Sequence, residues 1–355
     1  MRIPSWMVRK PGEPMALVDH DEVPGPGEVL VEVAGCGVCH TDLGFYYDGV
    51  VTRHPLPLTL GHEVSGRVVE AGPGAERWVG RAVVVPAVIP CGVCPACVAG
   101  RGGVCPKQVF PGNDVHGGFG THLKIPARGL CPVPDLSDPK VNPTGLALSD
   151  LSVIADAIST PYQAIVNADM KAGDLAVFVG AGGVGGFGVQ VAAALGAKVV
   201  AIDTSAERRE LASKHGADLA LEPGTPDGKA VRAAVRDFAT KAGIPSWRWK
   251  IFETSGSPQG QATAFALLGP GAHLGVVGFT PAKVEVRLSN LMAFDASARG
   301  TWGCLPEHYP AVLDLVLAGK VALTPFIERR PMASINQTFE DLHGRKVSRR
   351  VVLIP

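Results

Sequence analysis

Four cysteines between residues 91 and 105 are the densest group of potential metal ligands in the sequence. Their spacing is C-x2-C-x2-C-x7-C, formed by Cys91, Cys94, Cys97 and Cys105. Four thiolates on a short, glycine-rich segment can surround one tetrahedral ion, as Zn²⁺ or iron–sulfur chemistry requires. Because such a site is closed to substrate, we predict a structural zinc ion. A redox-active pair, an iron–sulfur cluster and metal-free thiols are the alternatives.

A second set of ligand types is scattered along the chain. Cys39 lies in G-V-C-H-T-D (37–42), His62 in G-H-E-V (61–64), and Asp156 in I-A-D-A-I-S-T. A thiolate, an imidazole and a carboxylate leave the fourth position of a tetrahedral ion open, which is the pattern of a catalytic zinc. Asp150 is a second candidate for the carboxylate. The scatter alone is weak evidence, because a single Cys is usually a core residue and a His after Gly is usually structural.

A glycine-rich segment, G-A-G-G-V-G at 180–185, follows the uncharged run 175–180 and precedes a predicted helix. In that context Gly180 makes a tight turn, Gly182 lets a pyrophosphate approach the backbone, and Gly185 lets the helix pack on the strand. The sequence therefore predicts a dinucleotide site. A tight strand–helix turn without a ligand is the alternative.

Asp203 refines this prediction, because it ends the next predicted strand, about twenty residues on. A carboxylate there binds a ribose 2′-hydroxyl and repels a 2′-phosphate, so we expect NAD rather than NADP. Arg208 and Arg209 lie nearby and weaken this expectation slightly. Both are expected on the solvated face of a helix.

The elements that must position these residues change in kind near residue 160. Before it, strand-like runs at 29–34, 64–71 and 81–86 are separated by Pro-Gly turns, so this half is β-rich. After it, strands at 175–180, 198–203, 249–254 and 273–278 alternate with helices at 188–197 and 205–216. That rhythm predicts βαβ units and a parallel sheet. The uncharged segment 175–197 has the length of a membrane span, but its clustered glycines divide it into strand, turn and helix.

Composition and charge exclude several classes. Hydrophobic residues make up 46% and charged residues 19% of the 355 residues, which is typical of a globular protein. Lys+Arg and Asp+Glu both number 33, so nothing in the balance suggests a nucleic-acid partner. The N-terminus shows no secretory signal, so we expect a cytoplasmic protein. Clustered cysteines in the reducing cytosol are more often metal ligands than disulfides.

The four motifs, in this order, resemble the zinc-dependent medium-chain alcohol dehydrogenases over essentially the whole chain. The resemblance implies an α/β protein with a GroES-like β-rich catalytic domain and a doubly wound parallel-sheet Rossmann domain. It places the catalytic domain at 1–158 and 297–355, with the last segment returning to it, and the NAD-binding domain at 159–296. It also implies two zinc ions per chain, NAD as cofactor, and a homo-oligomer, either a dimer or a tetramer.

The resemblance also assigns roles to individual residues. Cys39 and His62 match catalytic zinc ligands, and Glu63 matches an acid that can approach the metal. Thr41 matches the hydroxyl that accepts the alcohol proton, and His40 matches the residue that passes it outward. The third ligand departs from the family pattern, because many members have a cysteine where this chain has Asp156. The residues implied at the cofactor are Gly180, Gly182, Gly183, Val184, Gly185, Asp203, Arg208, Val277, Gly278 and Arg349.

The substrate is suggested by a narrower resemblance. Stretches 108–133 and 155–165 are similar to dehydrogenases of anaerobic aromatic degradation, which implies an alicyclic allylic alcohol carried as a CoA thioester. The product would be an enone, and the same site could then favour addition of water. One alternative is a general zinc alcohol or polyol dehydrogenase. Another is a reductase-like or non-catalytic relative without the open zinc, against which Cys39, Thr41 and His62 argue.

Overall fold

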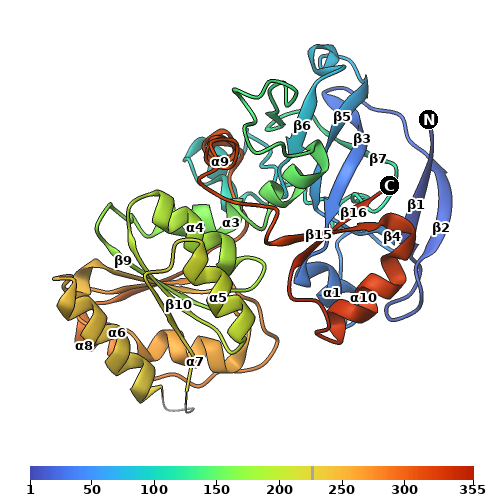
Figure 1. The fold of residues 1–355 in the computed structure, drawn as a ribbon. Coiled ribbons are helices and arrows are strands. Elements are labelled where there is room, and N and C mark those ends of the chain that lie inside the picture. Colours follow the sequence, from blue (N-terminus) through green and yellow to red (C-terminus); the bar gives the residue numbers. More distant parts are fainter. Residues whose placement is uncertain (225–227) are drawn as a thin grey trace. The chain divides into compact units, whose positions relative to one another are not determined.

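The computed structural model describes residues 1–224 and 228–355, which form two compact units (Figure 1). Unit 1 comprises Met1–Ser159, Gly303–Gly319 and Phe326–Pro355, and unit 2 comprises Thr160–Trp302 and Lys320–Pro325. The resemblance places the start of the returning segment at residue 297, whereas unit 1 resumes at Gly303. Strand β14 (Ser297–Gly300) pairs in parallel with β13 (His273–Val276), and therefore extends the sheet of unit 2.

Unit 1 is built on two sheets, as expected for the β-rich half. The larger sheet has the order β15-β16-β3-β5-β6-β8, with β7 also paired to β3, and the smaller has the order β2-β1-β4. The runs expected at 29–34, 64–71 and 81–86 are confirmed as β3, β5 and β6. The strands of unit 1 are β1 (Arg2–Val8), β2 (Ala16–Asp21), β3 (Glu28–Gly37), β4 (Leu58–Thr59), β5 (Glu63–Ala71), β6 (Ala82–Val85), β7 (His122–Pro126), β8 (Cys131–Pro132), β15 (Ile327–Pro331) and β16 (Arg350–Ile354).

Strand β3 is the centre of this unit, because β5, β7 and β16 all pair with it. It is rich in β-branched residues, which suit a buried strand, and Val29, Leu30 and Val31 are completely buried. The final strand β16 lies antiparallel to β3 with Leu353 opposite Cys36. The last strand of the chain therefore lies in the same sheet as β3 (Figure 1).

Short helices connect these strands and carry several of the candidate residues. They are α1 (His40–Tyr46), α2 (Pro95–Val98), α9 (Tyr309–Leu317) and α10 (Ile335–His343), with 3-10 turns η1 (Glu76–Trp78), η2 (Gly102–Val104), η3 (Leu148–Ala155), η5 (Pro306–His308) and η6 (Met332–Ser334). Cys39 is the N-cap of α1, and its backbone N–H donates to Asp42 Oδ2 at 2.9 Å. Such reciprocal capping fixes where a helix begins.

Unit 2 contains the predicted parallel sheet, in the order β11-β10-β9-β12-β13-β14. The chain runs from β9 to β10 on one side, whereas β12 lies on the other side of β9. Parallel sheets of this kind bind ligands at the carboxyl ends of the strands where the order reverses. The elements are β9 (Leu175–Val179), β10 (Lys198–Ile202), β11 (Leu219–Leu221), β12 (Trp249–Glu253), β13, β14, α3 (Ser159–Asn167), α4 (Gly185–Ala194), α5 (Ala206–Lys214), α6 (Lys229–Lys241), η4 (Ser246–Arg248), α7 (Pro258–Ala266) and α8 (Ser289–Phe294).

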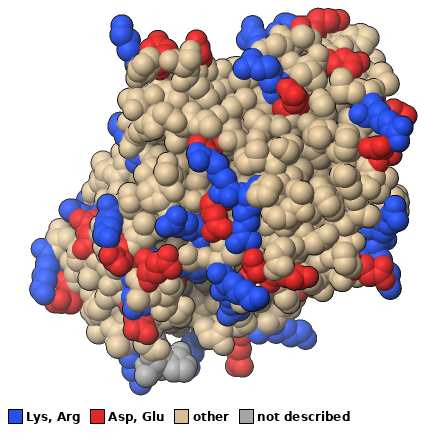
Figure 2. Space-filling model, turned by 45° about the vertical axis from the view of Figure 1, so that its right-hand side comes forward, with Lys and Arg blue, Asp and Glu red and all other residues tan. Residues whose placement is uncertain are grey.

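Helix α4 begins at Gly185, three residues earlier than the expected range 188–197, and ends at Ala194. Gly196 has a φ of +85°, a left-handed conformation that cannot continue an α-helix. No helix of the described residues is long and apolar enough to cross a membrane. On the described residues of the face drawn in Figure 2, Lys and Arg are interspersed with Asp and Glu between wide uncharged areas. This agrees with the formal net charge of zero.

Candidate metal and cofactor sites

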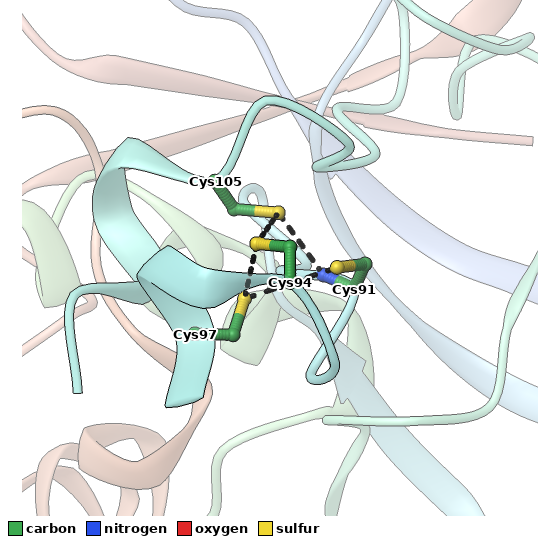
Figure 3. Close-up of side chains that lie close together, drawn as sticks. All are labelled: Cys91, Cys94, Cys97 and Cys105. Atoms are coloured by element: carbon green, nitrogen blue, oxygen red, sulfur yellow. Dashed lines mark hydrogen bonds between the residues drawn. The ribbon is translucent and has the colours of Figure 1, made fainter. Parts of the chain in front are cut away.

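The four clustered cysteines converge on one point in unit 1. Cys94 Sγ lies 3.5 Å from Cys97 Sγ and 3.7 Å from Cys105 Sγ, and Cys91 Sγ lies 3.9 Å from Cys97 Sγ (Figure 3). Four sulfurs placed about 2.3 Å from a central zinc at tetrahedral corners would lie about 3.8 Å apart. The sulfur positions therefore fit a zinc ion, and all four thiols are free of disulfides.

The backbone around the four cysteines affects their positions and the pKa of Cys91. Cys94 is the N-cap of the short helix α2, and Cys105 follows the turn η2. Hydrogen bonds from the backbone of Val93 and Cys94 lower the pKa of Cys91 to about 6. Burial and the neighbouring thiols raise the pKa of Cys97 to about 12, so these backbone donors favour the thiolate, the form that binds a metal, at Cys91 alone.

The scattered ligands also meet. Cys39, His62, Glu63 and Asp156 each offer an atom, and these atoms all lie within 4.8 Å of one another. Asp156 Oδ2 is 3.4 Å from Cys39 Sγ and 3.6 Å from His62 Nε2. Tetrahedral zinc with ordinary bond lengths would hold such pairs about 3.4–3.6 Å apart. The donor set of one sulfur, one nitrogen and one carboxylate oxygen therefore fits zinc.

Three elements of unit 1 deliver these ligands. Cys39 follows β3 at the start of α1, His62 directly precedes β5, and Asp156 directly follows η3. Asp42 connects the start of α1 with the segment that carries His62. Its Oδ1 accepts the N–H of Gly61 at 3.0 Å and lies 3.4 Å from His62 Nδ1. Asp42 stands in the quoted G-V-C-H-T-D motif, three residues after Cys39, but its role was not predicted.

Asp150, the second candidate for the third ligand, does not join this cluster. It is completely buried, and both of its oxygens accept hydrogen bonds from Arg329, at 2.6 and 2.7 Å. A carboxylate paired in this way with a guanidinium is already satisfied. The geometry therefore favours Asp156 over Asp150.

Arg350 is a part of this site that the sequence did not predict. Its guanidinium donates two hydrogen bonds to the Glu63 carboxylate and lies 3.6 Å from Asp156 Oδ2. Burial alone would lower the pKa of Arg350, but the negative charges of Glu63, Cys39 and Asp156 raise it well above the usual value. The guanidinium thus balances part of the negative charge of the ligand set. Arg349, the predicted cofactor residue, is exposed.

Thr41 and His40 lie at the start of α1, next to the metal ligands. Thr41 Oγ1 is 3.7 Å from Cys39 Sγ, and the side chain is half-buried. His40 is exposed. Thr41 thus places a hydroxyl beside the ligands, and the adjacent residue His40 places an imidazole at the surface. A hydroxyl and an imidazole in this order are groups that can carry a proton to solvent.

The glycine-rich segment has the predicted strand–turn–helix setting in unit 2. Gly180 follows β9 with a φ of +98°, a conformation that favours glycine. A Cβ on Gly185 would lie only 1.8 Å from the Gly180 carbonyl oxygen, so α4 can pack here only without a side chain. Gly183 and Val184 complete the turn. A Cβ on Gly182 would contact only the Arg208 side chain, at 3.5 Å, so the backbone there is open to a ligand.

Asp203 lies beside this turn, directly after β10. Its Oδ2 accepts the N–H of Ala181 at 2.7 Å, and its Oδ1 accepts the N–H of Ser205 at 2.8 Å. Arg209 is partly buried and donates to the carbonyl oxygens of Asp203 and Thr204. Arg208 and Arg209, expected on the solvated face of α5, are both half-buried, and Arg208 lies beside Gly182.

Val277 and Gly278 follow β13, and both N–H groups donate to the backbone carbonyl of Glu253, at 2.9 and 3.0 Å. The Glu253 side chain, completely buried, accepts the N–H groups of Ser255 and Gly256. These hydrogen bonds hold the chain segments after β12 and β13 together. Both segments lie at the carboxyl edge of the sheet, on the same edge as the glycine-rich turn.

Comparisons with known proteins agree with this arrangement. Residues 25–135 match the alcohol dehydrogenase GroES-like domain and residues 183–318 match the zinc-binding dehydrogenase family. An alcohol dehydrogenase of Geobacillus stearothermophilus is 32% identical over 92% of this chain and 91% of its own length. An L-threonine 3-dehydrogenase of Pyrococcus horikoshii is 32% identical over 98% of this chain and 97% of its own length. The structure of a cobalt- and zinc-bound thermostable alcohol dehydrogenase from Pyrobaculum aerophilum matches with a TM-score of 0.82 and 26% identity over 100% of both chains.

A GroES-like unit with two zinc sites and a Rossmann unit with a glycine-rich turn define a zinc-dependent dehydrogenase. The chain belongs to the zinc-dependent medium-chain alcohol dehydrogenase family. It is an NAD(P)-dependent enzyme that acts on CH–OH groups.

Proposed function

We propose that the chain oxidises a secondary alcohol at the site formed by Cys39, His62 and Asp156, with NAD as the acceptor. The observation that carries this proposal is the convergence of one sulfur, one nitrogen and two carboxylate oxygens within 4.8 Å of one another. Because Arg350 already holds the Glu63 carboxylate, Cys39, His62 and Asp156 are the proposed ligands. Three protein ligands leave a position for substrate, whereas the four-cysteine site has none. The four-cysteine site is accordingly proposed as structural.

The residues around the open site have separate proposed roles in the reaction. Zinc supplies Lewis acidity that lowers the pKa of an alcohol oxygen, and NAD supplies the hydride acceptor. The Thr41 hydroxyl takes up the alcohol proton, and exposed His40 releases it to solvent. Glu63, held by Arg350, is the acid that can approach the ligand set during ligand exchange. Asp42 orients the His62 ring.

Thr41 is tested with a pair of variants. Thr41→Val removes the hydroxyl while nearly keeping the volume, and should lower kcat by about 10²-fold or more, because proton transfer contributes that much. Thr41→Ser keeps the hydroxyl and should retain most of the activity. Both should keep the zinc content of the wild type. Equal activity of the valine and serine variants would remove Thr41 from the proton path.

The preference for NAD rests on Asp203, whose carboxylate is placed beside the glycine-rich turn by its hydrogen bond from Ala181. A carboxylate at this position binds ribose hydroxyls and repels a 2′-phosphate. The residues proposed to line the cofactor site are Gly180, Gly182, Gly183, Val184, Gly185, Asp203, Arg208, Val277, Gly278 and Arg349. The test is the ratio of kcat/KM for NAD and NADP. Asp203→Gly should shift this ratio toward NADP by at least about tenfold, a change of about 1.4 kcal/mol, and an unchanged ratio would contradict the assignment.

For the substrate, a small alcohol or polyol is the better supported candidate. The relatives at 32% identity are named as an alcohol dehydrogenase and an L-threonine 3-dehydrogenase. The narrower candidate is 6-hydroxycyclohex-1-ene-1-carbonyl-CoA, oxidised to the 6-oxo enone in anaerobic aromatic degradation. Phe110, in one of the two similar stretches, packs on His62 with ring centroids 4.8 Å apart, so this stretch borders the proposed metal site.

The deciding experiment compares NADH formation from an alicyclic alcohol as its CoA thioester, the same alcohol as the free acid, and a panel of simple alcohols and polyols. Turnover of the thioester alone would support the aromatic-degradation enzyme. Turnover of simple alcohols without preference for the thioester would leave the general dehydrogenase. If the thioester is the substrate, mass spectrometry of enzyme with enone product tests water addition, and the absence of a hydrated product would end that idea.

A homo-oligomer is also proposed, with β14 as the contact. All four residues of this last strand of the sheet are exposed, and Phe279, Leu288 and Met292 are exposed large hydrophobic residues of the same unit. An exposed sheet edge flanked by apolar side chains is a ready surface for a second copy. Light scattering after gel filtration should give the molar mass of a dimer or tetramer. The variant Arg299→Pro should give a larger monomer fraction than the wild type. A monomeric wild-type protein would contradict this proposal.

A further inference from the structure

A third group of metal-ligand side chains gathers in unit 1, outside both sites described above. His20 lies on β2, Glu22 follows that strand, and His116 lies between β6 and β7 in the chain. One ligand atom from each side chain lies within 4.8 Å of the others. Two imidazoles and one glutamate form a donor set that binds divalent transition metals with an open fourth position.

His20 is already oriented as a ligand. Its Nε2 lies 3.0 Å from Ser5 Oγ, and its Nδ1 lies 3.8 Å from Glu22 Oε1. When Nε2 donates to the serine oxygen, Nδ1 carries the free electron pair and faces the carboxylate. A second hydrogen bond of this kind typically fixes the tautomer of a metal-binding histidine. Tetrahedral zinc would bring the nitrogen and oxygen to about 3.4 Å, a small closure from 3.8 Å.

The two carboxylate oxygens of Glu22 have different neighbours. Its Oε2 accepts from Lys124 Nζ at 2.6 Å, which leaves Oε1 on the side of His20. The lysine thus fixes one oxygen of the carboxylate, while the other oxygen faces His20. Lys124 also places a positive charge near the site, which weakens the binding of any cation there.

His116 supplies the third ligand. Its ring contacts the rings of His20 and His54, with centroids 4.8 and 5.0 Å away. The N–H of Thr59 donates to His116 Nδ1 over 3.2 Å. Binding of an ion by Nε2 moves the ring proton to Nδ1 and gives up this long hydrogen bond, so the site should bind metal more weakly than the four-cysteine site.

Both imidazoles have lowered pKa values. Burial, and after it the positive charge of neighbouring imidazoles, lowers the pKa of His116 to about 4. Burial also lowers the pKa of His20, against the opposing charges of Glu22 and Asp21.

We propose that His20, Glu22 and His116 form a third metal site, specific for a divalent transition ion such as Zn²⁺. The ion would join β2 to the segment that carries His116. That segment is hydrogen-bonded to the chain leading to His62, through Gly117 to Thr59 and Gly118 to Gly61. Occupancy should therefore stabilise unit 1 close to the catalytic ligands.

The test is equilibrium dialysis of the full chain against buffered free Zn²⁺, with zinc per chain counted by mass spectrometry. The wild type should bind one ion more at saturation than His116→Gln or Glu22→Gln, whereas His343→Gln, an exposed histidine of the same unit, should match the wild type. Because the readout is a difference of one ion, it is independent of dehydrogenase activity and of how far the other two sites fill.

Cobalt provides a second readout. A third Co²⁺ equivalent bound by nitrogen and oxygen should add ligand-field absorption without the sulfur charge-transfer band of the cysteine sites. Circular dichroism confirms that the variants fold, and Glu22→Gln is the milder of the two changes. Equal zinc content of the wild type and both variants at every free-zinc concentration would overturn the proposal.

Discussion

Asp42 places Oδ1 3.4 Å from Nδ1 of His62, and both side chains are only 1% exposed. The other oxygen of Asp42 accepts the N–H of Cys39 at 2.9 Å. One carboxylate thus lies beside an imidazole and fixes the backbone of a thiolate, and these two side chains are two of the three proposed ligands. Carboxylates behind metal-binding histidines typically raise metal affinity and set the tautomer of the ring.

We therefore expect Asp42→Asn to lower zinc affinity at the open site, or kcat/KM, by about 10- to 100-fold. Zinc at the four-cysteine site should be unaffected, so the loss should stop at one ion per chain. Zinc titration and steady-state kinetics measure the two effects. Asp48→Asn, an exposed aspartate just after α1, is the matched control and should behave as wild type.

Asp156→Ala should remove the open-site zinc and lower kcat by about 10³-fold or more, since a catalytic metal contributes several kcal/mol. Asp156→Cys should recover zinc, because thiolate is also a zinc ligand. Asp150→Asn is the contrasting variant. It weakens the pair with Arg329 and should reduce stability while leaving the zinc content of the wild type. Loss of zinc in Asp150→Asn but not in Asp156→Ala would reverse the assignment.

Cys105→Ser should remove the structural zinc. The loss of a metal staple should cost at least about 2 kcal/mol, which corresponds to a fall in the unfolding midpoint of roughly 4–8 °C for a unit of this size. Differential scanning calorimetry with metal analysis measures both. Cys131→Ala, which alters another buried cysteine of unit 1, should keep the zinc content of the wild type. An unchanged zinc content in Cys105→Ser would show that this thiol is not a ligand.

His273 makes the stability of unit 2 depend on pH. Burial, followed by the positive charges of Lys250 and Arg299, lowers its pKa, and its Nδ1 lies 2.8 Å from Ser297 Oγ. In the unfolded chain the pKa is about 6.5, so below that pH the unfolded state binds more protons and stability falls as pH falls. Urea unfolding between neutral pH and pH 5 should show a smaller loss in His273→Gln than in the wild type. Parallel curves would contradict the prediction.

The sequence predicted the four-cysteine site from spacing alone, because its ligands are neighbours along the chain. It predicted Cys39 and His62 through resemblance. Arg350 was missed because its contact with Glu63 joins residues 287 positions apart, and no periodicity encodes such a pairing. Arg349, which the resemblance assigns to the cofactor instead, directly precedes β16 and is exposed. Since Arg350 is the first residue of β16, the register of that strand decides which arginine enters the core.

The secondary structure was predicted more securely than the contacts between side chains. The strands were confirmed because β-branched runs and Pro-Gly turns act locally. The start of α4 was placed late because Gly185, Gly186 and Gly188 are poor helix formers. In the structure they are buried and allow close packing, for a Cβ on Gly188 would lie 2.3 Å from the Phe178 ring. Tertiary packing therefore overrides local helix propensity at this position.

Unit 1 is interrupted in the chain, whereas most of unit 2 is one continuous stretch, from Thr160 to Trp302. During synthesis the parallel sheet of unit 2 emerges whole from the ribosome before β15 and β16 exist. Domains generally fold as units in order of emergence, so unit 2 should be folded first. Until β16 is synthesised, the negatively charged ligand set of Cys39, His62 and Asp156 lacks the positive charge of Arg350. The arrival of β16 beside β3 is thus the step that completes the site in the nascent protein.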